Sequence, residues 1–215
     1  TTVPSVAPAT VVSLQSAIDA WITDSTSAGV AAAVRFPNGA EWRGAAGYSD
    51  EVHRVAMDVD DRFRVASITK MVTAATEASL VEEGALGLDD PVTGVLPDSG
   101  LDSTLTMRHL LGHRSGLWNY TLAPGLAAGS WAPSPVEVVD AAVEAGSVFP
   151  PGSRFAYSNT NYVVIVLVLE AVTGRPAHAV IRARVLDTLE MRRTHLDGPE
   201  LGEIEAAPGG DPGTA

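Results

Sequence analysis

The sequence predicts an α+β fold in which helices outnumber the strands of a small antiparallel sheet. One observation is a pair of β-like segments separated by Pro37-Asn38-Gly39, because Asn-Gly is typical of the tight turn of a β-hairpin. The other is the spacing of apolar residues before and after this pair, which follows the helical period of about 3.6 residues. One helix, a hairpin and then mainly helices is the element order of an α+β protein.

The elements of the first third follow from these patterns. Apolar residues at helical spacing predict a helix over Val11–Thr23. Two strands should follow, over Gly29–Phe36 and Ala40–Gly47, and Asp58–Val65 should be extended. This last stretch would deliver the chain into the next helix.

The remaining helices are predicted from apolar spacing and from residues typical of helix ends. Ser67–Glu83 reads as a mostly buried helix that stops at Gly84, and Gly84–Pro97 is turn-rich around a short helix. Further helices are expected over Met107–Leu111 after Thr106, over Pro135–Ala145, from Asn159 or Thr160 to Thr173 before Gly174, and over Ala177–Leu189.

Four stretches are expected along the chain. Residues 1–10 form a flexible segment, residues 11–66 contribute a helix and a hairpin to a mixed α/β domain, and residues 67–196 form a mainly helical domain. Residues 197–215 are rich in Gly, Pro and Glu, which is typical of a linker, a processing site or a flexible tail. No internal repeat is visible.

Composition excludes several classes of function. A net charge of −12 argues against nucleic-acid binding, which depends on neutralising phosphates. The chain has no cysteine, which excludes disulfides, thiolate catalysis and cysteine-ligated metal. The longest apolar run, Tyr162–Leu169, is about half as long as a membrane span. We therefore expect no nucleic-acid partner, no membrane span and no cofactor.

The Pro/Ala/Ser/Thr-rich start of the chain resembles a mature protein whose signal peptide has been removed, although an artificial boundary would look the same. It predicts a secreted or extracytoplasmic protein.

Lys70 is the only lysine of the chain, and it stands three residues after Ser67. All the other basic residues of the Lys and Arg type are arginines. Arginine is effectively always charged, whereas a lysine in a dry or electropositive pocket can lose its proton and serve as a base. Residues three apart lie on one face of a helix, so the amine can reach the serine hydroxyl. A neighbouring base is what turns serine into a nucleophile. The alternative is a serine cap and a solvated surface lysine.

A helix that begins at Ser67 would add electrostatic support. The first turn of a helix has free backbone N–H groups and the positive end of the dipole, which favour an anion beside Ser67. The same N–H groups could form half of an oxyanion hole.

The second group of polar residues is Tyr157-Ser158-Asn159, at the entry to a buried helix. A phenol beside a lysine ammonium is stabilised as phenolate and can move protons. An asparagine can both donate to a substrate carbonyl and accept from its amide. The alternative is a packed Tyr157 and a helix cap at Asn159.

His109 and His113 are four residues apart on one predicted helix, which is the spacing of a zinc site. The glutamate of the zinc motif and a third ligand are both missing, so structural histidines are the favoured interpretation. Asp58, Asp60 and Asp61 could suggest calcium, but without the other loop ligands they indicate a solvated turn.

Three segments together resemble the serine β-lactamase-related superfamily: Phe63–Lys70, Leu105–Leu117 and Phe149–Gly174. The similarity runs from Gly29 to Leu196 and extends to class C β-lactamases, related esterases and secreted D-alanyl-D-alanine carboxypeptidases. It implies a β-lactamase and penicillin-binding-protein-like fold, with an antiparallel sheet flanked by helices plus a helical domain.

The resemblance also implies roles for single residues. Ser67 would be the acylated nucleophile and the donor of one oxyanion N–H, Lys70 its proton partner, Tyr157 a second proton relay and Asn159 a ligand for the substrate amide. By the same resemblance the rim of the pocket would be formed by Trp118, Asn119 and Tyr120. Aromatic rings there could hold an acyl chain, although surface packing explains them equally well.

The implied activity is that of a serine hydrolase that forms an acyl-enzyme on a peptide or other small-molecule substrate. A D-alanyl-D-alanine carboxypeptidase or penicillin-binding-like peptidase is expected first. Esterase, amidase or β-lactamase activity, or peptide formation by acyl transfer, are the alternatives. A non-catalytic binding protein of the same fold is disfavoured because the four polar residues are intact.

One motif of the superfamily has no counterpart here: a His or Lys followed by Thr or Ser and Gly, on a later strand of the sheet that also carries the second oxyanion N–H. A two-stranded hairpin is rarely stable alone and leaves an open edge. The C-terminal strands of the sheet are therefore absent from this chain, and we expect a second polypeptide segment to complete the sheet and the active site. Ala215 would then be a processing site, a proteolytic end or an artificial boundary, and Pro208–Ala215 would tolerate a cut.

Overall fold

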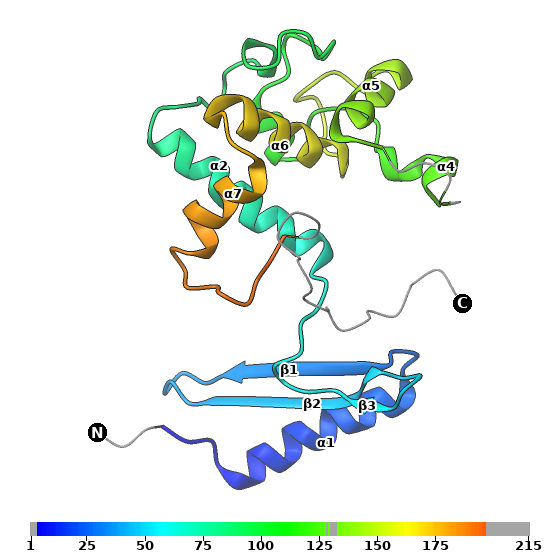
Figure 1. Ribbon diagram of the computed structural model, residues 1–215, viewed down its shortest axis with the longest axis vertical. Helices are drawn as coiled ribbons and strands as arrows, with labels where there is room; N and C mark the ends of the chain where they lie inside the picture. Colours follow the sequence, from blue (N-terminus) through cyan, green and yellow to red (C-terminus); the bar gives the residue numbers. More distant parts are fainter. Residues whose placement is uncertain (1–3, 128, 130–132, 197–215) are drawn as a thin grey trace. The chain divides into compact units, whose positions relative to one another are not determined.

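The computed structural model describes residues 4–127, 129 and 133–196. These residues form two compact units, one ending at Val65 and the other beginning at Ala66 (Figure 1). The tail predicted over residues 197–215 and the first three residues of the chain lie outside the described ranges.

The first unit contains helix α1 (Pro8–Asp24) and the strands β1 (Gly29–Arg35), β2 (Glu41–Asp50) and β3 (Val55–Ala56). The predicted hairpin is present: β1 and β2 are antiparallel, with Val34 opposite Trp42. At the turn, the side chain of Asn38 accepts a hydrogen bond of 3.0 Å from the backbone N–H of Ala40. Helix α1 lies along the sheet (Figure 1).

Several features of this unit differ from the sequence-based expectation, and one is that β2 continues to Asp50 instead of ending at Gly47. Helix α1 begins at Pro8, three residues before Val11, because proline fits the first turn of a helix. The short strand β3 was not predicted, and it extends the sheet in the order β1-β2-β3. Among the described strands, β1 is paired along one edge only.

The second unit is helical. A 3₁₀ turn over Ala66–Ile68 leads into α2 (Thr69–Glu82), and a further 3₁₀ turn covers Val92–Gly94. The remaining helical elements are α3 (Met107–Leu111), a 3₁₀ turn over Tyr120–Leu122, α4 (Pro124–Ala127), α5 (Pro135–Ala145), α6 (Thr160–Thr173) and α7 (Ala177–Ile181). Residues Arg182–Leu186, which follow α7, are π-helical.

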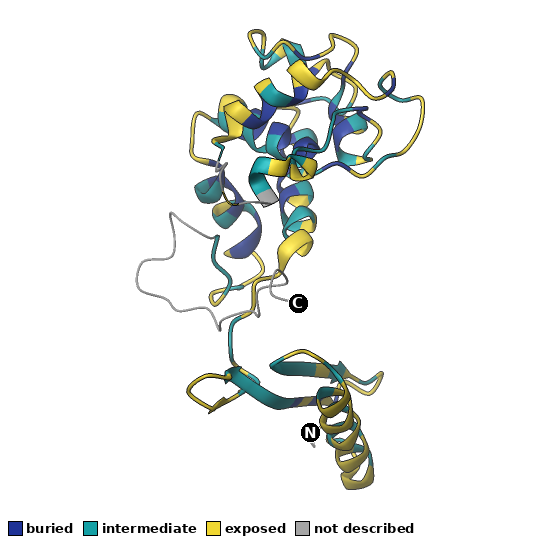
Figure 2. Ribbon diagram, turned by 90° about the vertical axis from the view of Figure 1, so that its right-hand side faces the viewer, coloured by how far each residue is buried: buried dark blue, intermediate teal, exposed yellow. Residues whose placement is uncertain are grey.

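The core of this unit lies around α6. Val164, Ile165, Val168 and Leu169 are fully buried, and α6 packs against α2, α3 and α5. Most of the buried residues, dark blue in Figure 2, belong to the helical unit. A helix that is apolar on all sides is stable only when it is enclosed in this way. The packing fixes the start of α6 beside α2, and this is where the predicted polar residues lie.

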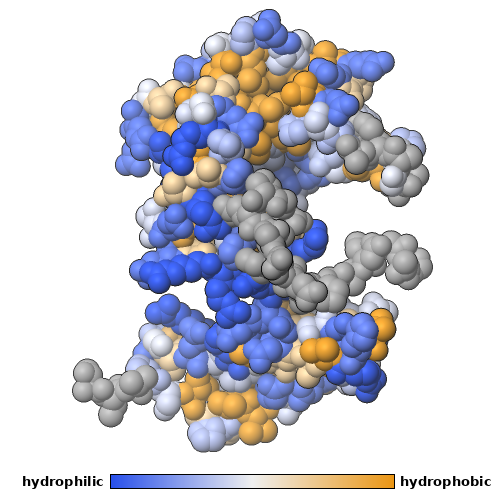
Figure 3. Space-filling view, in the orientation of Figure 1, coloured by the Kyte–Doolittle hydropathy of each residue, from blue (hydrophilic) through white to orange (hydrophobic). Residues whose placement is uncertain are grey.

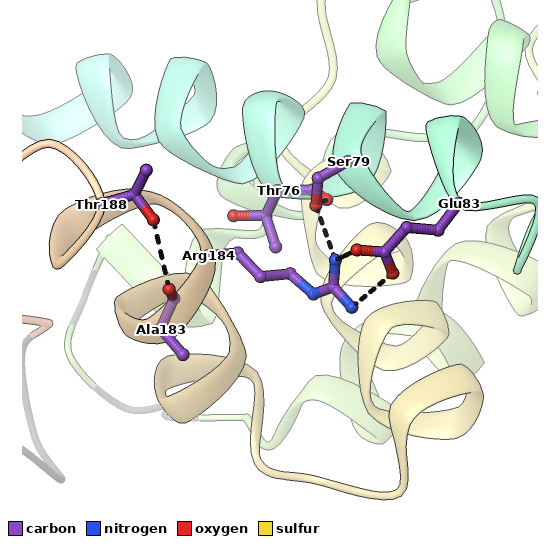
Figure 4. Close-up of polar contacts among 6 residues, drawn as sticks. All are labelled: Thr76, Ser79, Glu83, Ala183, Arg184 and Thr188. Carbon is purple, nitrogen blue, oxygen red and sulfur yellow. Dashed lines mark hydrogen bonds and ion pairs between the residues drawn. The ribbon is translucent and has the colours of Figure 1, made fainter.

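The predicted single helix over Ala177–Leu189 is divided into α7 and the π-helical segment. The widened turn carries Arg184, whose guanidinium donates two hydrogen bonds of 2.8 Å to the Glu83 carboxylate at the end of α2 (Figure 4). It donates a third, of 3.1 Å, to Ser79 Oγ. Because the same bonds favour the charged carboxylate, they hold the pKa of Glu83 below its usual range.

Both polar and apolar side chains reach the surface of the molecule (Figure 3). The exposed apolar side chains include Ile68, Met71 and Phe155, which lie close in sequence to Ser67 and Tyr157. No single helix of the described residues has the length and hydropathy of a membrane span. Helix α6 and the segment Ala177–Leu186 have this length and hydropathy only when taken together, and a bend of 80° separates them.

Candidate active site

Ser67 lies in the 3₁₀ turn that precedes α2, and Lys70 lies in the first turn of that helix. The Lys70 ammonium Nζ donates a hydrogen bond of 3.0 Å to Ser67 Oγ, which is the contact expected for a Ser-x-x-Lys pair on one face. The preceding residue, Ala66, has a φ of +43°, a left-handed conformation that costs energy for a residue with a Cβ. This sharp entry turns the chain into the helix immediately before Ser67.

The Tyr157-Ser158-Asn159 segment meets this pair from the start of α6. The hydroxyl oxygens of Tyr157 and Ser67 are 2.8 Å apart. Lys70 Nζ also donates a hydrogen bond of 2.7 Å to Asn159 Oδ1. Four predicted site residues from two distant segments are thus joined by hydrogen bonds into one cluster.

The cluster changes the acidity of the phenol. Lys70 first, and Ser67 second, lower the pKa of Tyr157 because both favour an oxyanion at its hydroxyl. The tyrosine side chain is accessible to solvent, so water screens part of this effect. A phenol of lowered pKa beside a serine hydroxyl can both accept and return a proton.

Asn159 is held by a second layer of polar groups. Its backbone N–H donates a hydrogen bond of 3.0 Å to Asn119 Oδ1. Its side-chain amide is 3.4 Å from the same oxygen and 3.3 Å from Thr121 Oγ1. Thr121 was not predicted from the sequence. Its neighbours in the chain give no sign that it contacts Asn159, which lies 38 positions later.

Main-chain groups of Trp118 and Tyr120 form hydrogen bonds with the start of α6. The carbonyl oxygen of Trp118 accepts a hydrogen bond of 2.6 Å from Thr160 Oγ1, and the backbone N–H of Tyr120 donates one of 3.1 Å to the same hydroxyl. Trp118 lines an open depression together with Ala123, Gly125, Ala141, Glu144 and Ala145. A substrate-binding role for Trp118 and Tyr120 stays a prediction.

The two histidines perform different tasks. His109 completes a capping box at the start of α3, where its Nδ1 accepts from the backbone N–H of Thr106 at 3.3 Å. His113 lies beside Tyr157, with ring centroids 4.4 Å apart. Within the described ranges no group of three or more His, Cys, Asp or Glu side chains is placed to hold a metal ion.

The three aspartates lie in a hydrogen-bonded turn. Asp61 Oδ2 accepts from the backbone N–H of Asp58 at 2.8 Å, and Asp58 Oδ1 accepts from that of Asp60 at 2.8 Å. Asp60 also pairs with Arg43 at 2.9 Å. The carboxylates of Asp58 and Asp61 stabilise this turn. The start of the stretch Asp58–Val65, which was expected to be extended, is therefore a turn.

The chain is similar to known proteins over most of its length. The family model described as Beta-lactamase matches residues 14–214. Penicillin-binding protein 4 of Amycolatopsis lactamdurans is 31% identical over 186 residues, which cover 84% of this chain and 48% of that protein. Esterase EstB of Burkholderia gladioli is 35% identical over 170 residues, which cover 70% of this chain and 42% of that protein.

A solved structure of a D-stereospecific amidohydrolase from Streptomyces sp. matches with 34% identity and a TM-score of 0.72, over 84% of this chain and 55% of that one. A D-amino acid amidase from Ochrobactrum anthropi SV3, complexed with D-phenylalanine, matches with 30% identity and a TM-score of 0.74, over 82% of this chain and 49% of that one. The chain therefore spans about half the length of the relatives it matches. The expected fold class and the expected superfamily are confirmed, and the chain belongs to the beta-lactamase family.

Proposed function

We propose that the protein is a serine hydrolase that forms an acyl-enzyme on Ser67. The observation that carries the proposal is the position of Ser67 Oγ, which is 3.0 Å from Lys70 Nζ and 2.8 Å from the Tyr157 hydroxyl. Two groups able to exchange a proton thus contact one alcohol, which is the arrangement that activates a serine nucleophile.

The chemistry follows from these contacts. Ser67 Oγ attacks the substrate carbonyl while its proton passes to the Tyr157–Lys70 pair. The backbone N–H of Ser67 donates to the oxyanion that forms. The pair then gives the proton to the leaving amine or alcohol as its bond to the carbonyl carbon breaks. Attack by water on the acyl-enzyme, with the same proton transfers, releases the acid and restores Ser67.

Asn159 is assigned to the substrate. Its Oδ1 accepts from Lys70, and its amide nitrogen is oriented by Asn119 and Thr121, so the side chain is held in one orientation. Both contacts of the amide nitrogen are long, and the carbonyl of a bound peptide or amide can replace one of them as the acceptor.

A D-alanyl-D-alanine carboxypeptidase or penicillin-binding-like peptidase is the first choice of substrate class, and the similarity to a penicillin-binding protein supports it. Amidase or esterase activity is the second, supported by the similarities to a D-stereospecific amidohydrolase and to an esterase. In each case the bond cleaved is an acyl–nitrogen or acyl–oxygen bond, and the acyl group is carried by Ser67.

We also propose that further strands pair with the open edge of β1. The proposal is supported by the one-sided pairing of β1 among the described strands. Such a segment would supply the second oxyanion N–H.

The acyl-enzyme is tested on the chain produced together with the proposed strand-bearing segment. The complex is labelled with a fluorescent penicillin and with a serine-reactive fluorophosphonate, and the adduct is identified by mass spectrometry. Ser67→Ala should abolish labelling by both, and the adduct of the wild-type protein should map to the peptide that contains Ser67. Ser153→Ala, a matched change at an exposed serine, should be labelled normally. Unchanged labelling of Ser67→Ala would place the nucleophile elsewhere.

A further inference from the structure

His113 lies behind the phenol of the site. It follows the C-terminus of α3 and has a φ of +52°, a left-handed conformation that histidine adopts more readily than most residues. Its imidazole lies against the Tyr157 ring, with centroids 4.4 Å apart and planes inclined by 30°. The ring of Tyr162, on α6, is 5.5 Å away, and that of Phe155 meets the imidazole edge-on at 6.0 Å.

The hydrogen bonds around His113 fix which ring nitrogen carries the proton. The backbone N–H of Ser158 donates to His113 Nδ1 at 3.3 Å, so Nδ1 has a free lone pair. The side chain of Asn161 reaches the same nitrogen at 3.2 Å. A neutral imidazole that accepts at Nδ1 has its proton on Nε2.

The orientation of Asn161 is set independently. The Ser115 hydroxyl accepts from the backbone N–H of Leu117 at 3.0 Å and donates to Asn161 Oδ1 at 2.6 Å. The amide oxygen is therefore occupied, and the amide NH₂ faces His113. Ser115 and Asn161 are both buried, so breaking this chain of hydrogen bonds would leave polar groups unpaired away from water.

Charge also favours the neutral ring. Burial first, and the nearby Lys70 ammonium second, lower the pKa of His113, so the imidazole is uncharged at neutral pH. The titratable groups that face it are Lys70 on α2, Tyr157 before α6 and Tyr162 on α6. A proton on Nδ1 would abolish both acceptor contacts and place a second cation beside Lys70.

We propose that His113 is a positioning residue for Tyr157, acting as a neutral imidazole whose face supports the phenol ring and whose Nδ1 anchors the Ser158 N–H and the Asn161 amide. It acts through Tyr157 and does not touch the substrate. The imidazole supports one face of the Tyr157 ring, and its Nδ1 fixes the backbone at Ser158, the next residue. Together these two contacts hold the Tyr157 hydroxyl beside Ser67. This assignment rests on the proposed function, because it gives Tyr157 the proton-relay role.

Two variants separate the two contributions of the imidazole. His113→Asn suits the left-handed backbone and keeps a short side-chain acceptor, but it removes the ring. His113→Phe keeps a ring against Tyr157 but removes the acceptor. Because small displacements of a catalytic group are costly, each should slow acylation of Ser67 by about 10- to 100-fold. His109→Asn, a matched change at the histidine of the α3 capping box, should leave the acylation rate within about twofold of the wild type.

The pKa of Tyr157 distinguishes a positioning role of His113 from a merely structural role, which would leave this pKa unchanged. The phenolate absorbance of Tyr157 is obtained as the difference between each protein and the same protein carrying Tyr157→Phe. The pKa of Tyr157 should rise toward the ordinary tyrosine value in both His113 variants, because the hydroxyl no longer stays beside Lys70 and Ser67. Near-normal acylation together with unchanged Tyr157 titration in either variant would overturn the proposal.

The wild-type protein provides a test that does not depend on the folding of a variant. Histidine ¹⁵N–¹H correlation spectra at neutral pH should show His113 as the Nε2–H form, with Nδ1 unprotonated. A proton on Nδ1 would overturn the assignment. The Tyr157 titration and the ¹⁵N spectra test the role of His113 and do not require acylation. Labelling of Ser67→Ala tests the proposed function. A failure of the His113 assignment can therefore be distinguished from a failure of the acyl-enzyme proposal.

Discussion

At the scale of single residues, the ammonium of Lys70 contacts both Ser67 and Asn159. It is held by Ser67 Oγ at 3.0 Å and by Asn159 Oδ1 at 2.7 Å, and it lies 5.1 Å from the centre of the Tyr157 ring. A primary amine can donate to both oxygens and still release a proton, which a guanidinium cannot do.

Lys70→Arg should therefore be nearly as damaging as Lys70→Ala, with losses of at least ~10²-fold in the acylation rate for each. The rate is measured from the time course of adduct formation by mass spectrometry. Circular dichroism and thermal unfolding serve as the control that both variants are folded. Near-normal activity of Lys70→Arg would show that only the positive charge is needed and would refute the base assignment.

Most of the cluster could be predicted from the sequence, because Ser67 with Lys70 and Tyr157 with Asn159 are each recognisable over a few residues. The supporting contacts could not. His113 meets Tyr157 across 44 positions of the chain, and this contact depends on how α3 and α6 pack. The catalytic and substrate-binding roles of the cluster stay predictions until the variants are measured.

At the scale of elements, α2 contains a buried carboxylate. Glu77 is fully buried, and neither of its oxygens has a hydrogen-bond partner within the described chain. Burial without a compensating partner raises its pKa from 4.5 to about 7. The acid is therefore mainly neutral in the folded protein at mildly acidic pH and must ionise inside the helix at higher pH.

The sign of the effect on stability follows from the direction of this pKa shift. Between about pH 4.5 and pH 7 the folded state binds the Glu77 proton and the unfolded state releases it, so the free energy of unfolding falls as the pH rises. The full loss is on the order of 3 kcal/mol. Glu77→Leu should remove this pH dependence and should stabilise the protein more at pH 8 than at pH 5.

Urea unfolding at the two pH values measures the effect. Glu82→Leu, at an exposed position of the same helix, is the matched control and should keep the pH dependence of the wild type. Equal stabilisation by Glu77→Leu at both pH values would mean that Glu77 has a partner which keeps it ionised.

Helices α3, α5 and α6 have local end signals and were predicted with the observed bounds. Thr106 caps α3, Ser134 caps α5 through a capping box with Glu137, and Gly174 ends α6 with a φ of +62°. The helix predicted over Ser67–Glu83 begins only at Thr69, after the 3₁₀ turn, and it is less buried than expected. Two further errors fall where such signals are weak. Strand β3 is two residues long and exists only by pairing with β2, and the turn after α7 widens where Arg184 reaches Glu83.

At the scale of the whole molecule, the boundary between the two units falls after Val65, immediately before the turn that carries Ser67. The order of elements and the fold class were predictable because the hairpin and the helices are signalled separately along the chain. The extracytoplasmic location and the second polypeptide segment stay predictions.

Co-expression tests the second segment. The chain is produced alone and together with a downstream segment of the same gene product that carries several strands and a His- or Lys-led Thr/Ser-Gly motif. We expect the chain alone to aggregate or expose apolar surface and to resist labelling by fluorescent penicillin, and the two together to elute as one complex and to be labelled. A monomeric chain that is labelled without the segment would contradict this expectation.

The single lysine of the chain has a practical consequence for chemical modification. Apart from the terminal amine, the one primary amine of the 215 residues is Lys70 Nζ, which is held against Ser67 and Asn159. Reagents that attach dyes, crosslinkers or solid supports to lysine would therefore react at the proposed reaction centre. Conjugation for microscopy or immobilisation is best directed to other functional groups, such as introduced thiols, whereas an acylated Lys70 would itself report on access to the site.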